Sequence, residues 1–393
     1  MDQKKENILA LVPAIRMIMS EHSLKSGSFV LLDQLNETDP EKITLRLGRT
    51  ISVFRGEPEQ VLKQVEAAKE DIGEYVFIEE AGLLGLSSNK SKVEQKLATV
   101  RKESRGADLP EPVASPQFRK SLYNRVVAIT GAAMGFGEGI ARQLFTEGAN
   151  VVIMDINEKE GKRLAAELNK HRSTNRALFT RADVSSLDSM ENAVYETILE
   201  FSGLDVLISN AGVLKAGSIE ELDEKDFDMV TRVNYKGYYN CVKAAVPVMK
   251  LQNRFSGQNF GDIIQINSKS GLEGSKKNFA YAGSKFAGIG LTQSFAKELI
   301  LDRIKVNSIC PGNFFEGPLW SDPKNGLFVQ YLNTGKVPGA KTIEDVKRHY
   351  ESMVPAGRGC RVEDVVKAIK YVIEQEYETG QAIPVTGGQV MLS

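Results

Sequence analysis

Hydrophobic and polar positions follow a regular pattern along most of the chain. From residue 122 onwards, short apolar runs rich in β-branched residues are separated by longer segments whose apolar residues recur at helical spacing. Parallel strands buried on both faces give continuous apolar runs, and each covering helix shows one apolar stripe. The pattern predicts an α/β domain over 122–393 with a doubly wound parallel seven-stranded sheet, whose strands we place at 126–129, 151–154, 178–179, 206–208, 263–266, 304–306 and 382–383.

Residues 1–104 show a second, smaller α/β pattern. Apolar residues at helical spacing predict helices at 8–19, 61–68 and 93–100, and β-forming runs predict strands at 29–32, 43–47, 51–54 and 75–78. This segment contains no glycine-rich phosphate loop and no set of cysteines and histidines. We interpret it as a packing or assembly domain of unknown role, and a regulatory or substrate-delivery role is the alternative.

The two regions are joined by a segment of different composition. Residues 105–121 are rich in proline and polar residues and have no hydrophobic period, which indicates a linker. Few contacts usually cross a domain boundary of this kind. We therefore expect a chain that begins near Ala114 to fold and to bind its cofactor without the N-terminal domain.

Composition narrows the class of protein. Of 393 residues, 42% are hydrophobic and 26% charged, and the net charge is −1. These values are ordinary for a soluble globular protein and predict no basic surface for a nucleic acid or an anionic membrane. The three cysteines and three histidines are scattered, so we expect no disulfide framework and no metal site. The first residues lack the apolar core of a signal peptide, and no apolar run approaches the length of a membrane span, so we expect a cytoplasmic protein.

A glycine-rich loop directly follows the first strand of the larger domain. The segment 130–137 reads Thr-Gly-Ala-Ala-Met-Gly-Phe-Gly and opens an amphipathic helix. Glycines at this point permit a tight turn and let a pyrophosphate approach backbone N–H groups at a helix N-terminus. The spacing Gly-x-x-x-Gly-x-Gly differs from the usual dinucleotide-binding spacing, and a plain turn is the alternative. The candidate cofactor contacts in the loop are Gly131, Ala133, Met134, Gly135, Phe136 and Gly137.

Polar or small residues follow the next three strands, at the edge where doubly wound sheets bind ligands. Asp155 ends the second strand. A carboxylate there accepts hydrogen bonds from the adenosine ribose and repels a 2′-phosphate, which favours NAD over NADP. Capping of the following helix is the alternative role. The other candidate contacts are Ile156 beside Asp155, Asp183 and Val184 after the third strand, and Asn210, Ala211 and Gly212 after the fourth.

The segment 268–285 brings a hydroxyl, a phenol and an ammonium group together. Ser268 lies just past the strand at 263–266. Tyr281 and Lys285 are four residues apart in a segment with helical period, so they share one face of a helix. A neighbouring ammonium group lowers the pKa of a phenol from about 10, which suits a phenol that exchanges a proton with an alcohol or a ketone. An ordinary tyrosine and a solvated lysine are the alternative.

Together these residues resemble the short-chain dehydrogenase/reductase family over residues 122–393. The resemblance adds Asn234 and the run Pro311-Gly312, and it includes the usual spacing between the serine and the tyrosine. It implies a Rossmann-type fold, oxidoreductase activity on a CH–OH group, and a catalytic set of Asn234, Ser268, Tyr281 and Lys285.

The resemblance also implies a role for each of these groups. Tyr281 is then the general acid/base, and Lys285 lowers its pKa and bonds the nicotinamide ribose. Ser268 then donates to the substrate oxygen, and Asn234 holds a water that links the lysine to solvent. Tyr281 and Lys285 also count as cofactor contacts, together with Pro311, Gly312 and Asn313. Where many members of the family have a threonine shortly after the Pro-Gly pair, this chain has Asn313-Phe314-Phe315, so that contact stays unassigned.

Five segments resemble more closely the polyol-phosphate dehydrogenases within this family, namely 263–271, 274–276, 288–294, 358–360 and 385–391. This implies NAD-dependent interconversion of a sugar-alcohol phosphate and a ketose phosphate, such as sorbitol 6-phosphate and fructose 6-phosphate. A phosphate group is bound by cationic side chains, so lysines near Ser268 are candidate phosphate ligands. The alternative is that these lysines are ordinary solvated surface residues. The candidate substrate contacts are Ser268, Lys269, Ser270, Lys276 and Tyr281. The long segment 313–358 contains aromatic residues and predicts a lid.

Two other functions stay open on the sequence. One is a dehydrogenase of an unphosphorylated sugar, polyol or sugar acid, and the other is an NAD-binding scaffold without turnover. The resemblance implies a homo-oligomer, a dimer or a tetramer, built partly by the helices that carry Asn234 and Tyr281. Residues 75–102 also resemble the tail of aldolase domains that precede dehydrogenase domains in some bifunctional sugar enzymes. The metal-binding histidines of those aldolases have no counterpart here, so we expect no lyase activity.

Overall fold

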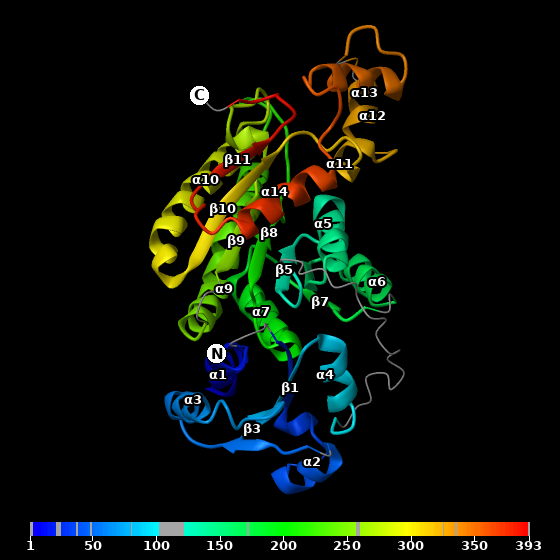
Figure 1. Ribbon diagram of the computed structural model, residues 1–393. Helices are drawn as coiled ribbons and strands as arrows, with labels where there is room; N and C mark the ends of the chain where they lie inside the picture. The colour runs from blue at the N-terminus through cyan, green and yellow to red at the C-terminus, as the bar shows by residue number, and fades with distance from the viewer. Residues whose placement is uncertain are drawn as a thin grey trace.

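The computed structural model describes residues 3–391 except 21–24, 37, 48, 80, 102–121, 171–172, 257–259, 325, 334 and 336. It contains two sheets, one in a small N-terminal body and one in a larger body that follows (Figure 1). The predicted linker at 105–121 lies outside the described residues. None of the helices in the described ranges is both long and apolar enough to cross a membrane.

The larger body contains a parallel sheet of seven strands, as predicted. The strand order is β11-β10-β9-β8-β5-β6-β7, and every neighbouring pair is parallel. The order reverses between β5 and β8, and ligands bind at the carboxyl ends of strands beside such a switch point. The strands are β5 (Val126–Thr130), β6 (Asn150–Asp155), β7 (Ala177–Arg181), β8 (Val206–Ser209), β9 (Gly261–Ile266), β10 (Ile304–Pro311) and β11 (Ala382–Val385).

Helices cover both faces of this sheet and bury their apolar stripes against it. One face carries α5 (Gly135–Thr146), α6 (Glu158–Asn169) and α14 (Val362–Glu374). The other carries α7 (Leu187–Phe201), α9 (Gly237–Arg254) and α10 (Phe279–Leu299). Shorter helices lie in the connections: α8 (Glu224–Val230), η2 (Thr231–Lys236), η3 (Lys269–Gly271), η4 (Ile300–Asp302), α11 (Pro318–Ser321), α12 (Leu327–Asn333) and α13 (Ile343–Ser352).

The N-terminal body is a four-stranded sheet of order β1-β4-β3-β2 with helices on both sides. Its strands are β1 (Ser26–Leu31), β2 (Ser52–Phe54), β3 (Tyr75–Ile78) and β4 (Gly82–Ser87). Its helices are α1 (Gln3–Ile18), η1 (Leu32–Gln34), α2 (Pro40–Leu47), α3 (Pro58–Ala67) and α4 (Lys90–Leu97).

Two predictions for this body are wrong. The segment 43–47, predicted as a strand, is part of helix α2, which begins at Pro40, a residue whose fixed φ suits the first turn of a helix. Ile43 packs into the core from this helix. The central strand β4 was missed because its sequence, Gly-Leu-Leu-Gly-Leu-Ser, contains two glycines, which are depleted in strands. It pairs antiparallel with both β1 and β3.

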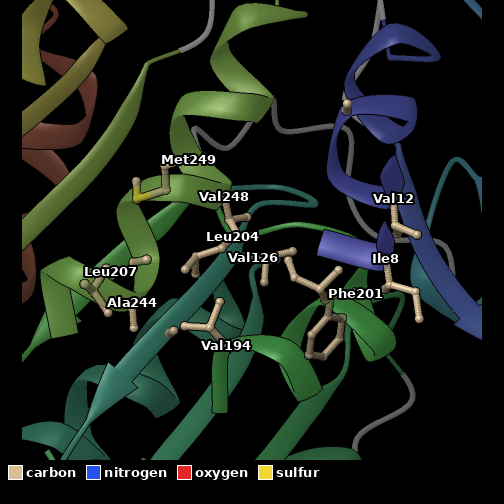
Figure 2. Close-up of a cluster of buried hydrophobic side chains, with 14 of the residues drawn as sticks. Ile8, Val12, Val126, Val194, Phe201, Leu204, Leu207, Ala244, Val248 and Met249 are labelled. Atoms are coloured by element: carbon tan, nitrogen blue, oxygen red, sulfur yellow. The ribbon is translucent and has the colours of Figure 1, made fainter. Parts of the chain in front are cut away.

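The two bodies share one hydrophobic core, so the expectation that few contacts cross between them is wrong. Helix α1 lies beneath α7 and α9 (Figure 1). Figure 2 shows Ile8 and Val12 of α1 beside Phe201, Leu204 and Val248 of the larger body. All five side chains are at most 3% exposed. The N-terminal body therefore covers apolar surface at the end of the large sheet where the strands begin.

Buried ion pairs reinforce this contact. The guanidinium group of Arg16 makes a two-point contact with Asp205, with Nη2–Oδ2 and Nη1–Oδ1 distances of 2.9 and 3.1 Å. The ammonium group of Lys90, at the start of α4, lies 2.9 Å from Glu200 at the end of α7. These charges are largely removed from water, so each partner depends on the other for compensation.

The segment between β10 and α14 forms a small lobe with its own apolar cluster. Trp320 packs edge-on against Phe315 with ring centroids 4.9 Å apart, and Phe328 lies 5.1 Å from the tryptophan. Val346 of α13 completes the same cluster. The lobe projects past the sheet at the end opposite the N-terminal body (Figure 1).

Candidate active site

The glycine-rich loop has the backbone conformation of an anion-binding turn. Gly131 and Gly135 have φ values of 64° and 61°, which glycine adopts without strain. A Cβ at Gly137 would lie 2.1 Å from the carbonyl oxygen of Gly131, so only glycine allows α5 to begin this close to β5. Helix α5 starts at Gly135, and its first N–H groups face the turn. This cradle fits the pyrophosphate of a dinucleotide.

Asp155 lies at the end of β6, next to this loop. Its carboxylate accepts hydrogen bonds from the N–H groups of Ala133 and Asn157, at 2.9 and 2.8 Å. The cap of the following helix is Asn157, whose side chain accepts from Glu160 N, so Asp155 does not fill the alternative role of a helix cap. Ile156, beside it, is 63% exposed and offers an open apolar surface.

The loops after β5 and β8 touch at the switch point. Asn210 donates from Nδ2 to the carbonyl oxygens of Thr130 and Gly131, both at 3.0 Å. A Cβ at Gly131 would lie 2.8 Å from the Cα of Ala211, so the two loops are in direct backbone contact. Gly212 then leads from this contact towards the polar groups of the site.

Asp183 and Val184 lie after β7, one strand further along the sheet edge. The Asp183 carboxylate accepts a hydrogen bond from Ser185 N at 2.9 Å. Val184 is 7% exposed and packs against Gly237, where a Cβ would lie 2.8 Å from its Cγ2. Both residues therefore line the same edge as the glycine-rich loop and Asp155.

Ser268, Tyr281 and Lys285 come together at the end of β9. Ser268 directly follows the strand, and its Oγ accepts a hydrogen bond from Ser270 N at 3.1 Å. Lys285 donates from Nζ to the carbonyl oxygen of Ile266 at 3.0 Å, and Nζ lies 5.6 Å from the centroid of the Tyr281 ring. A hydroxyl, a phenol and an ammonium group thus lie close together at the end of β9.

Burial shifts the pKa values of both helical groups. Burial raises the pKa of Tyr281 above its ordinary value, and the hydrogen bond with Ser268 only partly offsets this. Burial lowers the pKa of Lys285 to about 8. The expected lowering of the Tyr281 pKa is therefore wrong, because burial of the phenol raises its pKa by more than its hydrogen bond with Ser268 lowers it.

Asn234 lies in a π-helical segment, η2, between α8 and α9. The N–H of Gly237 bonds the carbonyl of Arg232, five residues earlier, as a π-helix requires. The Asn234 amide accepts from Val213 N at 2.8 Å and donates to Ser284 Oγ at 3.0 Å. Its Oδ1 lies near Gly212, where a Cβ would be 3.4 Å from it and 3.7 Å from Lys285 Nζ. Asn234 therefore joins the other three groups. No sequence pattern predicts this π-helical turn, a feature that is common at functional sites.

The segment after β10 closes over the glycine-rich loop. Gly312 donates from its N–H to Val385 O at 3.0 Å, and Asn313 accepts from Cys360 N at 2.8 Å. Phe314 stacks on Phe136 with ring centroids 4.2 Å apart and an interplanar angle of 16°. Sequence reasoning missed Phe314, for which the only signal was an aromatic residue in each of the two loops. The stack places Pro311–Asn313 beside the cofactor cradle.

Two of the predicted substrate contacts are lysines in the segment between Ser268 and Tyr281. Lys269 is half-buried on η3, directly after Ser268, and Lys276 is exposed just before α10. Among the described residues, neither lysine has a carboxylate partner. By contrast, Lys277 Nζ lies 3.8 Å from Glu221 and Lys215 Nζ 3.4 Å from Asp226.

The groups at this site can move a proton and stabilise charge on a substrate oxygen. In the described part of the chain, no three His, Cys, Asp or Glu side chains are grouped to hold a metal ion. The phenol, the hydroxyl and the ammonium group are instead arranged around one point at the carboxyl edge of the sheet. The cradle beside them fits a dinucleotide.

Comparison with known proteins finds dehydrogenases and reductases that are similar to this chain. The short chain dehydrogenase family matches residues 125–319. The sorbitol-6-phosphate 2-dehydrogenase of Escherichia coli strain K12 is 34% identical over 270 residues, which are 68% of this chain and 99% of that protein. The solved structure of the Erwinia amylovora sorbitol-6-phosphate 2-dehydrogenase has 34% identity and a TM-score of 0.62 over 68% of this chain and 100% of its own. A 3-ketoacyl-(acyl-carrier-protein) reductase of Brucella melitensis, solved with NADH, has 26% identity and a TM-score of 0.57 over 68% and 99%.

Proposed function

Because this chain belongs to the short-chain dehydrogenase/reductase family, whose members are oxidoreductases that use a nicotinamide cofactor, we propose a specific reaction for it. The reaction is the NAD-dependent interconversion of a sugar-alcohol phosphate and a ketose phosphate, of the sorbitol 6-phosphate and fructose 6-phosphate type. The observation that carries this proposal is the 34% identity over 99% of a sorbitol-6-phosphate 2-dehydrogenase, together with an intact group of Ser268, Tyr281 and Lys285.

The positions of the three side chains support the catalytic roles that we propose for them. A nicotinamide cofactor, held by the cradle at the end of β5, would supply the hydride chemistry at the substrate carbon. In ketone reduction, Tyr281 donates its proton to the substrate oxygen, and in alcohol oxidation it accepts that proton. Ser268 donates a hydrogen bond to the same oxygen and so stabilises the negative charge that develops there. The raised pKa of Tyr281 keeps the phenol protonated, which is the form that reduction needs.

Lys285 and Asn234 support the proton transfer. The ammonium group of Lys285 lies beside the tyrosine ring and stabilises the phenolate when it forms. Asn234 holds a water molecule that connects the lysine with solvent and so returns the proton to the site. Both amide N–H groups of Asn234 already donate, to Val213 O and Ser284 Oγ, and its Oδ1 accepts from Val213 N, so these bonds hold the residue in place near Lys285.

The residues of the cradle hold the cofactor, and they favour NAD. Gly131, Gly135 and Gly137 shape the turn for the pyrophosphate. Asp155 accepts hydrogen bonds from the adenosine ribose, and its negative charge disfavours a 2′-phosphate. The other contacts are Ala133, Met134, Phe136, Ile156, Asp183, Val184, Asn210, Ala211, Gly212, Tyr281, Lys285, Pro311, Gly312 and Asn313.

The substrate phosphate binds at Lys269 and Lys276, which have no carboxylate partner among the described residues. Lys269 stands one residue from Ser268, and Lys276 five residues before Tyr281. Ser270 adds a hydroxyl to the same turn. The lobe 313–358, with its aromatic cluster, covers the substrate and excludes water during the reaction.

The chain is organised as an N-terminal domain at 1–104, a linker at 105–121 and a dehydrogenase domain at 122–393. The N-terminal domain supports the fold of the larger one and forms part of the assembly. We expect a cytoplasmic homo-oligomer in which α9 and α10 meet a second copy. Tyr239 and Phe286 on these helices are 41% and 46% exposed and supply apolar area for the contact.

The experiment is a substrate panel with the full-length protein. NADH consumption is followed by its absorbance with fructose 6-phosphate, other ketose phosphates and the matched unphosphorylated ketoses, and each reaction is repeated with NADPH. Preference for a ketose phosphate with NADH supports the proposal. Turnover only with unphosphorylated ketoses points to the second function, and NADH binding without any turnover points to the scaffold.

A further inference from the structure

The residue just before Ser268 makes an unusual set of contacts. Asn267 is 3% exposed, and its amide group uses both N–H donors: Nδ2 donates to Lys285 O at 2.9 Å and to Gln265 Oε1 at 2.8 Å. Its Oδ1 accepts from the backbone N–H of Ser268 at 2.8 Å. We propose that Asn267 is a positioning residue, whose side chain ties the end of β9 to α10 and so sets Ser268 against Tyr281 and Lys285.

Two hydrogen bonds join the end of β9 to α10. In one direction, Asn267 donates to the backbone carbonyl of Lys285. In the other, Lys285 donates from Nζ to the carbonyl of Ile266 at 3.0 Å. Two hydrogen bonds between the same two short segments fix both the height and the rotation of the helix against the strand end. Tyr281, one turn earlier on α10, is held by the same constraint.

The surroundings of Asn267 are built to hold this amide. Gly271 has no room for a side chain, because a Cβ there would lie 2.3 Å from Asn267 Oδ1. Gln265, which receives one of the two N–H groups, also accepts from Ser308 Oγ at 3.1 Å and is 2% exposed. Gly288 of α10 leaves the space for Gln265, since a Cβ there would lie 2.3 Å from its Nε2. The network therefore runs from β10 through β9 to α10.

The consequence concerns the rate of the chemical step. Displacement of a reacting group by about 1 Å can cost about 100-fold in rate, while binding of the cofactor is left intact. Among the described residues, the Asn267 side chain bonds Gln265, Ser268 and Lys285 and makes no hydrogen bond to the glycine-rich loop, Lys269 or Lys276. Its loss is therefore expected to lower kcat and to leave KM and NADH affinity nearly unchanged. This inference rests on the proposed function for the roles of Ser268 and Tyr281.

The test compares three variants of the full-length protein. Asn267→Ala removes all side-chain bonds. Asn267→Asp keeps the acceptor for Ser268 N but turns the donors towards Lys285 O into acceptors. The control is Asn253→Ala, which removes an equally buried amide that bonds the carbonyls of Asp302 and Arg303 at 2.9 and 2.8 Å. Asn253 lies beside Gly261, at the opposite end of β9 and roughly 20 Å from Ser268 at about 3.3 Å per strand residue.

The expected result is a split between stability and rate. All three variants lower the thermal midpoint, but only the two Asn267 variants lower kcat, by about 10- to 100-fold, with KM changed less than threefold. Gly271→Ala should lower kcat in the unmodified protein and add less in the Asn267→Ala background, because its severe clash, at 2.3 Å, is with the Asn267 amide, while Lys285 O lies 3.1 Å from the added Cβ. Equal kcat losses in the Asn267 and Asn253 variants, or additive losses with Gly271→Ala, would overturn the inference.

A second measurement does not depend on the substrate. Crystal structures of the unmodified, Asn267→Ala and Asn253→Ala proteins with NADH give the distance from Ser268 Oγ to the Tyr281 hydroxyl. We expect this distance to change, or Ser268 to take several rotamers, only in Asn267→Ala. An unchanged site in that variant contradicts the inference even if no ketose phosphate is reduced. Absence of ketose-phosphate turnover with a displaced Ser268 instead contradicts only the proposed substrate.

Discussion

The ion pair between Arg16 and Asp205 gives a sharp test of how the two domains are joined. Arg16 is fully buried and donates to three groups, namely the Asp205 carboxylate, Lys25 O at 2.9 Å and Asn124 O at 3.3 Å. Asp205 also accepts from Val126 N at 2.7 Å, so it anchors the first residue of β5. Replacement of Arg16 by Met keeps much of the aliphatic volume and leaves the carboxylate without its counter-charge.

The expected loss follows from the burial of both groups. Removal of one partner of a buried ion pair costs about 3–5 kcal/mol, because the remaining charge stays uncompensated. Asp205 is 7% exposed, and within the described part of the chain its carboxylate keeps only Val126 N and, at 3.3 Å, Gln252 Nε2 as donors. We therefore expect Arg16→Met to lower the free energy of unfolding by about 3–5 kcal/mol, a large part of the 5–15 kcal/mol typical of a folded protein.

The assay is urea unfolding of the full-length chain, followed by circular dichroism. The control is Arg55→Met, which breaks the exposed pair of Arg55 with Glu79, also at 2.9 Å, where the side chains are 68% and 48% exposed. Exposed pairs contribute about 0.2–1 kcal/mol, so this variant should stay close to the unmodified protein. The double variant Arg16→Met/Asp205→Asn should be more stable than Arg16→Met alone, since the amide oxygen still accepts from Val126 N but carries no charge.

The reasoning is refuted if Arg16→Met and Arg55→Met lose the same stability. It is also refuted if Asp205→Asn in the Arg16→Met background gives no recovery. Either result would mean that water reaches the Arg16–Asp205 pair in solution, and that α1 contributes little to the stability of the larger domain.

Three further predictions concern the cofactor, the proton and the domain boundary. Asp155→Asn keeps a hydrogen-bond acceptor for the backbone but removes the negative charge. The preference for NADH over NADPH, measured as a ratio of kcat/KM values, should therefore narrow by about 1–3 kcal/mol. Equal use of NADH and NADPH by the unmodified protein would contradict the role of Asp155. The rate of ketone reduction should fall as the pH rises through about 8, because Lys285 is charged below its lowered pKa and neutral above it. A pH–rate profile that stays flat to pH 10 would contradict the role of the charged lysine. A chain that starts at residue 122 should be insoluble or unfolded, because it exposes the apolar side chains that α1 covers and leaves Asp205 without its partner Arg16. A truncated protein that is soluble in size-exclusion chromatography and binds NADH would contradict the shared core.

The sequence predicted the larger domain well because its signals are local. Each buried parallel strand is a continuous apolar run, and each is followed by a polar or glycine-containing turn at the carboxyl edge. Asp155, Asn210 and Ser268 could therefore be placed at one edge of a sheet before any contact was known. The direction of the tyrosine pKa was missed, because burial at Tyr281 depends on side chains from several distant segments.

The N-terminal domain was harder to predict for a physical reason. Its helix α1 has an ordinary apolar stripe, and Arg16 looks like a basic residue near a helix end. Only the fold shows that Arg16 is inside the protein, paired with a residue 189 positions away. The alternation of apolar and polar residues from Ile43 to Leu47 is compatible with a strand and with a short helix. Packing of Ile43 into the core stabilises the helix.

The most direct test of the central claim is turnover by Tyr281→Phe. The substitution keeps the ring and its packing and removes only the hydroxyl group that exchanges the proton. With the ketose phosphate that the unmodified protein uses best, we predict that kcat falls by roughly two to four orders of magnitude, while NADH still binds with its normal affinity as measured by fluorescence. Turnover within a few-fold of normal, with NADH bound, would contradict the assignment of Tyr281 as the general acid/base and with it the proposed mechanism.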